Sequence, residues 1–210
     1  MTRKGRAFWA WVTAALCVCG GIRAGILGSA HDFSGAGWNT SGEICRPCHT
    51  PHAALSALIP LWNHDTTVAS FTLYSSDTLD ASVHQPTGPS KACLSCHDGT
   101  IALNSFGGNT GTERIGDGAD LGTDLSDDHP ICFVYDSGLA TTDPALYDPT
   151  SRTVPALEGA TVREGMLVND ELHCTSCHDA HNARGDSVFT SYMLLVDNAG
   201  SALCLTCHRK

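Results

Sequence analysis

Eight of the 11 cysteines in this 210-residue chain fall into four copies of one pattern, Cys-x-x-Cys-His. The copies occupy residues 45–49, 93–97, 174–178 and 204–208. Two thiols at this spacing lie on one short turn, where both can add to the vinyl groups of a single porphyrin, and the adjacent imidazole can reach the iron. The pattern therefore predicts four covalently attached haem c groups.

Each motif would supply two thioether links and one proximal iron ligand. The predicted thioether residues are Cys45, Cys48, Cys93, Cys96, Cys174, Cys177, Cys204 and Cys207. The predicted proximal ligands are His49, His97, His178 and His208. Other cysteine chemistry explains the pattern less well. A thioredoxin-like site needs one Cys-x-x-Cys, structural zinc needs no histidine after every pair, and a disulfide framework has varied spacings.

The first 24 residues have the features of a secretory signal peptide. A positively charged region precedes an apolar stretch at residues 7–18, and Ala24 offers a small residue for cleavage. A retained membrane anchor is the alternative, but the stretch is short and interrupted by glycines. We therefore expect a secreted mature chain, residues 25–210, without a membrane span.

The charge of the chain restricts its partners. The net charge is −10, and the first 24 residues contain four basic and no acidic side chains. The mature chain would therefore keep 8 basic against 22 acidic residues, a net charge of −14. Such a surface disfavours nucleic acid and anionic membranes, and favours partners with positive patches.

Histidines outside the motifs are candidates for the second axial position of each iron. Seven of them remain, whereas only two methionines follow the signal segment. We predict bis-histidine ligation, with the distal ligands His31, His52, His129 and His181. His52 and His181 each lie three residues beyond a proximal ligand, so they would point away from that iron and reach a neighbouring haem. Saturated irons suit electron transfer rather than substrate binding.

The remaining candidates are weaker. For each chosen distal ligand the alternative is a surface or hydrogen-bonded histidine. His64 is the reserve ligand, with packing beside Trp62 as its equal alternative, and the last two histidines, His84 and His173, are predicted bystanders. Cys132 is expected to be a buried free thiol rather than an intersubunit disulfide. The acidic run at residues 117–128 matches no calcium loop, and no catalytic motif or catalytic residue is predicted.

The motif order suggests two dihaem units, at residues 31–105 and 165–210, joined by a Gly- and Asp-rich segment, 106–164, within one tetrahaem domain. The first and third motifs both continue as Cys-x-x-Cys-His-x-x-His. Duplication of a two-haem module explains this similarity, and similarity imposed by the motif itself is the alternative.

The expected fold is a multihaem cytochrome c, mostly coil with short helices and few short strands wrapped around the haems. Residues 53–59 are predicted to form a short helix stopped by Pro60, and residues 68–74 a short strand with Phe71 and Leu73 on one face. Each motif should lie on a turn or short helix. Folding should depend on haem attachment.

Several longer strings extend the pattern and resemble a known family. They are Cys-Arg-Pro-Cys-His-Thr-Pro-His at 45–52, Pro-Leu-Trp-Asn at 60–63, Cys-Leu-Ser-Cys-His-Asp-Gly-Thr at 93–100, Asp-Leu-Ser-Asp-Asp-His-Pro at 124–130 and Leu-Cys-Leu-Thr-Cys-His at 203–208. The chain is thus similar to tetrahaem outer-surface cytochromes that assemble into extracellular filaments in metal-reducing bacteria. The resemblance implies bis-histidine ligation by the four distal residues named above, closely packed haem pairs, end-to-end polymerisation and one distal ligand from a neighbouring subunit.

Three functions are compatible with these features. The first is extracellular or cell-surface electron conduction through a haem filament, with outer-membrane cytochromes or extracellular acceptors as redox partners. The second is a discrete periplasmic electron shuttle between redox proteins. The third is a multihaem reductase with one open iron.

Overall fold

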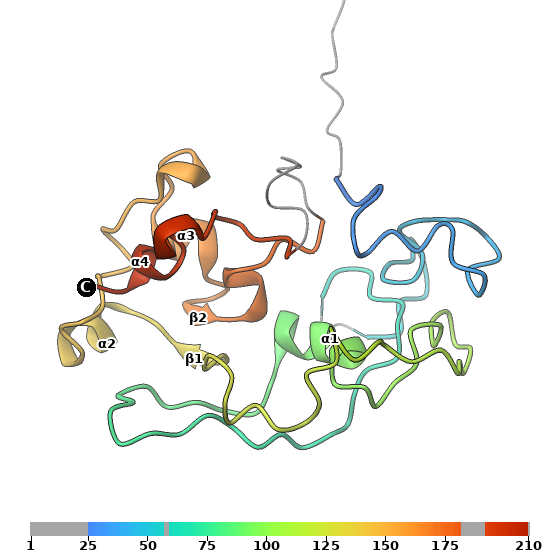
Figure 1. Ribbon diagram of the computed structural model, residues 1–210, viewed down its shortest axis with the longest axis horizontal. Coiled ribbons are helices and arrows are strands. Elements are labelled where there is room, and N and C mark those ends of the chain that lie inside the picture. The colour runs from blue at the N-terminus through green and yellow to red at the C-terminus, as the bar shows by residue number, and fades with distance from the viewer. Residues whose placement is uncertain (1–24, 57–58, 182–191, 210) are drawn as a thin grey trace, which may run out of the picture.

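The computed structural model describes residues 25–56, 59–181 and 192–209, so the predicted signal peptide lies outside the described residues. The chain is mostly coil, as predicted (Figure 1). The helices are α1 (Gly88–His97), α2 (Ser137–Thr142), α3 (Val162–Met166) and α4 (Cys204–Cys207), with short 3-10 turns η1 (Pro155–Leu157), η2 (Cys174–Ser176) and η3 (Ala199–Ser201). Within these ranges, none of the helices is long and apolar enough to cross a bilayer.

The two strands, β1 (Phe133–Val134) and β2 (Glu171–Leu172), pair antiparallel with Phe133 opposite Leu172. Local capping explains the short helices. Proline stands in the first turn of α1, where its missing N–H costs nothing. In α3, Thr161 and Glu164 form a reciprocal capping box. These elements carry little of the chain, so the coil between them positions most of the predicted haem residues.

The helix predicted over residues 53–59 is not formed in its described part. Ala53 has a left-handed backbone with φ of 55°, which interrupts a right-handed helix. The Leu55 N–H donates to the Trp62 carbonyl at 2.8 Å, because the chain folds back on itself here instead of continuing as a helix. The contact between Leu55 and Trp62 therefore outweighs the local preference of this segment for a helix.

The strand predicted over residues 68–74 is extended chain with one parallel bridge, from Thr72 to Asp124. The predicted face is nevertheless formed. Phe71 is buried in a small cluster with Leu94 of α1 and Leu125, and Leu73 packs against the same cluster. Instead of a sheet, side-chain burial holds this segment, together with the Gln85 side chain, which hydrogen bonds the N–H and the carbonyl of Phe71 at 2.9 Å each.

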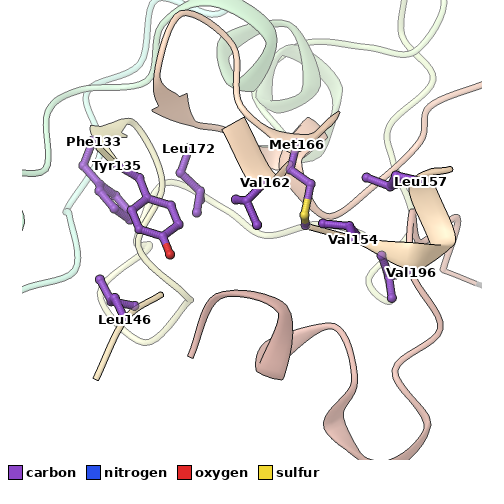
Figure 2. Close-up of a cluster of buried hydrophobic side chains, with 9 residues drawn as sticks. All are labelled: Phe133, Tyr135, Leu146, Val154, Leu157, Val162, Met166, Leu172 and Val196. Atoms are coloured by element: carbon purple, nitrogen blue, oxygen red, sulfur yellow. The ribbon is translucent and has the colours of Figure 1, made fainter. Parts of the chain in front are cut away.

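The larger side-chain core lies in the C-terminal half and is shown in Figure 2. It contains Phe133, Tyr135, Leu146, Val154, Leu157, Val162, Met166, Leu172 and Val196. Figure 1 shows this half, with α2, α3 and α4, at one side of the molecule and the blue N-terminal segment at the other. Helix α1 lies between them and packs against η2 of the third motif.

Candidate haem sites

The four Cys-x-x-Cys-His motifs share one local conformation. In three of them the histidine N–H donates to the carbonyl of the first cysteine, at 2.8 Å for His49, 3.0 Å for His178 and 2.9 Å for His208. The second motif forms the end of α1. The prediction of turns and short helices is confirmed, and each turn places two thiols and an imidazole on one short stretch of backbone.

Three motifs are also fixed by the same antiparallel bridge to a distant residue. His49 bridges Trp62, His178 bridges Leu194, and His208 bridges Leu146. Both flanking hydrogen bonds are present in every case, for example Thr50 N–H to the Leu61 carbonyl at 2.8 Å. The first and third motifs therefore share this bridge as well as their sequence pattern. The bridge is not specific to them, because the fourth motif forms it too.

Backbone carbonyls orient the rings of the predicted ligands. A carbonyl only accepts, so a ring Nδ1 next to one carries the proton and Nε2 presents its lone pair to a metal. The carbonyls are those of Pro60 for His49 (3.1 Å), Ala119 for His97 (2.8 Å), Tyr192 for His178 (2.8 Å), Ala180 for His31 (3.2 Å) and Pro130 for His129 (2.9 Å). Such second-shell bonds fix the tautomer of metal-ligating histidines.

The structure brings predicted proximal and distal ligands together in three pairs. The ring centroids are 6.0 Å apart for His49 and His181, 6.1 Å for His97 and His31, and 6.3 Å for His208 and His129. Two metal–nitrogen bonds of about 2 Å, with about 1 Å from each nitrogen to its ring centre, span about 6 Å. Each pair is therefore spaced to hold one iron between its imidazoles.

His178 and His52 remain outside these pairs. The His178 ring is oriented by the Tyr192 carbonyl like the other proximal ligands, yet within residues 25–56, 59–181 and 192–209 no second imidazole contacts it. His52 is exposed, and its side chain makes no hydrogen bond or ring contact with the described residues. Within one chain, the proximal candidate His178 and the distal candidate His52 are therefore each left without a partner imidazole among the described residues.

The other three histidines are engaged by the polypeptide. His64 is buried beside Trp62, with a centroid distance of 6.1 Å, and both its ring nitrogens face backbone carbonyls. His84 and His173 each approach Glu171, at 3.4 Å from Nε2 to a carboxylate oxygen. These contacts leave none of the three presented to an iron, which favours the packed alternative for His64.

Cys132 is fully buried, as expected. Its sulfur lies 3.6 Å from His173 Nδ1. The acidic run at 117–128 is mostly exposed, and the described residues contain no cluster of potential metal ligands.

The cysteine side chains of successive motifs are neighbours. Burial raises the pKa of Cys96 to about 12, and Cys48 of the first motif adds to the shift. Contact with Cys174 of the third motif raises the pKa of Cys93. Burial raises the pKa of Cys207, in the fourth motif, to about 12, and a third-motif thiol contributes next. The motifs therefore follow one another in space in chain order.

An apolar cavity adjoins the third motif. Cys174, Cys177 and His178 line it. The apolar walls include Leu73, Leu94, Leu125, Ile131 and Leu172. His129, which pairs with His208 of the fourth motif, also borders the cavity. This wall of leucine and isoleucine beside two thiols and an imidazole suits the flat apolar surface of a porphyrin.

The residues present fit haem c. Beyond the paired imidazoles, Trp62 Nε1 is buried with no hydrogen-bond partner among the described residues, and a haem carboxylate would be a suitable acceptor for it. Haem c would supply a one-electron ferric/ferrous couple. The polypeptide would hold it through the cysteine pairs, orient both imidazoles through backbone carbonyls and exclude water with the apolar walls.

Comparison with known families agrees with this chemistry. A family model described as "Doubled CXXCH motif" matches residues 166–210, which contain the third and fourth motifs. The match supports the broad class of multihaem c-type cytochromes. This class is associated with electron transfer, and its motifs indicate covalently bound haem c. No curated protein is similar enough in sequence to count as a match.

Sequence reasoning missed one structural residue of these sites. Asn63 donates its side-chain amide to the Arg46 carbonyl at 2.7 Å, and its backbone N–H bonds the Cys48 carbonyl at 2.9 Å. Asn63 thus ties the segment after residue 60 onto the first motif. The signal was present in the string Pro-Leu-Trp-Asn at 60–63, whose role cannot be deduced from spacing alone.

Proposed function

We propose that this protein is a tetrahaem c-type cytochrome that conducts electrons and polymerises head-to-tail, with His52 of each copy ligating the third iron of its neighbour opposite His178. The observation that carries the proposal is the incomplete pairing within one chain. Three pairs are spaced for an iron, and one proximal and one distal candidate are left over.

Equivalent positions support the choice of His52 as the crossing ligand. The bridge of the first motif encloses residues 50–61, and that of the third encloses residues 179–193. His52 and His181 each lie near the start of their enclosed segment. His181, from the third motif, faces the first-motif ligand His49. The equivalent contact of His52 is with the third-motif ligand His178, and it is made on another copy.

Exposed apolar side chains support contact between copies at these segments. Leu55 and Leu61, close to His52 in the chain, are 46% and 52% exposed, and Tyr192, whose carbonyl orients His178, is 75% exposed. We take the contact to be heterologous, so that each copy gives His52 to one neighbour and receives the His52 of another. A heterologous contact that does not close into a ring propagates as a filament.

Electron conduction follows from saturation and spacing. Iron with two imidazoles has no open site for a substrate, so its reactivity is restricted to gaining and losing electrons. Transfer rates fall exponentially with distance, and the thiols of successive motifs are neighbours. A chain of four haems in motif order, continued into the next copy, gives a path without a catalytic step.

Haem content gives the first test of the proposal. We expect four haems per mature chain, because every motif presents both thiols and an oriented or paired imidazole. Intact-mass spectrometry and the pyridine haemochrome assay measure this number directly. A colourless product, or the mass of the bare polypeptide, would exclude every function proposed here.

The native assembly separates conduction in a filament from the alternatives. Electron microscopy and sedimentation of secreted holoprotein should show filaments, and reduced filaments should bind no carbon monoxide. Monomers with four low-spin haems would support the periplasmic shuttle instead. A reductase is favoured by the single imidazole that one chain gives its third iron, so carbon monoxide binding to one haem in four of the native protein would support that function.

A further inference from the structure

The segment 145–152 folds over the fourth motif and bonds the end of its short helix. The last carbonyls of a helix have no partners inside that helix. In α4 the Cys207 carbonyl accepts from the Tyr147 N–H at 2.8 Å. The Leu205 and Thr206 carbonyls accept from the Arg152 guanidinium, at 3.0 Å from Nη2 and 3.2 Å from Nε. Arg152 therefore holds both residues that separate the two cysteines of this motif.

The first motif is held in the same register, but by a neutral group. In both motifs the histidine forms an antiparallel bridge, and the residue after its bridge partner donates its N–H to the carbonyl of the second cysteine. This residue is Asn63 in the first motif and Tyr147 in the fourth. The Asn63 side-chain amide also donates to the Arg46 carbonyl at 2.7 Å. Arg46 occupies the place that Leu205 has in the fourth motif. The group that bonds this carbonyl is thus an amide in one site and a guanidinium in the other.

The positive charge of Arg152 has no carboxylate beside it. A guanidinium stays protonated in proteins. The group is half-buried, with Cζ 4.1 Å from the centre of the Tyr147 ring, and among the described residues it forms no ion pair, whereas Arg163 pairs with Asp170. Burial is the main cause that raises the pKa of Cys207, and the charge of Arg152 acts against it. This charge therefore acts on a thioether position of the fourth haem.

We propose that Arg152 positions the fourth haem and raises its reduction potential. The proposal rests on haem attachment in the proposed function and is independent of filament formation. Reduction removes one positive charge from a haem, so a fixed cation beside it disfavours the ferric state and favours the ferrous state. Partial burial of the guanidinium limits the screening of this effect by salt. Arg152 is a positioning residue, not an iron ligand, and the neutral amide at the first motif makes no such contribution to the first haem.

Redox titration of holoprotein variants tests the inference. In Arg152→Gln one quarter of the haem absorbance should titrate at lower potential, with a ratio of reduced to oxidised haem about tenfold lower at fixed potential, which is 59 mV for one electron. Arg152→Lys keeps the cation and should keep the wild-type curve, although it lacks the planar fork of a guanidinium. Arg163→Gln is the matched control, because it removes the same charge from a guanidinium that Asp170 neutralises, at 3.1 Å from Nη2 to Oδ2.

Each outcome supports or overturns the inference. An Arg152→Gln protein with four haems and an unchanged titration would overturn it, and so would an equal shift in Arg163→Gln. If Arg152→Gln loses the fourth haem, the comparison rests on Arg152→Lys. Four haems and a wild-type curve in that variant support the charge role, whereas a lowered quarter of the curve or a lost haem contradicts it. Failure of the proposed function would be seen separately, as fewer than four haems in the wild-type protein.

Discussion

Replacing His52 with alanine is expected to abolish filaments and to leave one iron in four open to carbon monoxide. Each chain pairs three sets of imidazoles by itself, at centroid distances of 6.0 to 6.3 Å, so three irons should stay saturated in the variant. The third iron would keep only His178. Because His52 is exposed and its side chain makes no hydrogen bond or ring contact with the described residues, its loss should not unfold the monomer. Electron microscopy and spectra of the reduced protein with carbon monoxide measure both effects.

Two further variants make this result specific. His181→Ala removes the distal partner of His49 inside the chain, so it should also open one iron to carbon monoxide, while the contact between copies is kept and filaments persist. His84→Ala, at a half-exposed histidine paired with Glu171, should change neither property. Filaments of normal length from His52→Ala would show that another contact joins the copies. A closed dimer of the wild-type protein would show that the exchange is reciprocal.

The haem sites could be predicted from sequence because haem attachment needs residues that are close together in the chain and regularly spaced. Two cysteines and a histidine within five residues determine a local turn, and the turn forms in all four motifs. The distal candidates His31, His129 and His181 are each found facing a proximal ligand, and Cys132 is buried. Their roles as iron ligands stay predictions, supported by this spacing.

The pairing and the local structure could not be predicted, because they depend on contacts between distant segments. His31 is 66 residues from His97 in the chain, and no sequence pattern joins them. The helix predicted over residues 53–59 is absent in its described part because the Leu55 N–H donates to the Trp62 carbonyl, where the chain folds back. His64 was considered as a reserve iron ligand, and only the structure shows that both its ring nitrogens face backbone carbonyls. Propensity and spacing carry no information about such tertiary contacts.

Replacing both Cys174 and Cys177 with serine is expected to remove the third haem and the cooperative unfolding of the protein. The cavity beside this motif is lined by Leu94 and Leu125 of the small cluster around Phe71. Leu172 of the larger core also lines it. A haem in this cavity would join the two clusters. Removing a buried leucine side chain costs about 2–5 kcal/mol. A porphyrin is several times larger, so its loss rivals the whole net stability of about 5–15 kcal/mol of a typical domain.

Thermal unfolding by circular dichroism and limited proteolysis of the purified holoproteins measure this loss. The double variant should show no sharp transition and rapid cleavage between the two clusters. Cys132→Ser is the matched control, since Cys132 is fully buried beside His173 but belongs to no motif. It should keep four haems and a sharp transition, at a cost of about 1–3 kcal/mol for the changed buried group. A double variant that unfolds as sharply as the control would mean that side chains alone join the two clusters. The third haem would then contribute little to the stability of the fold.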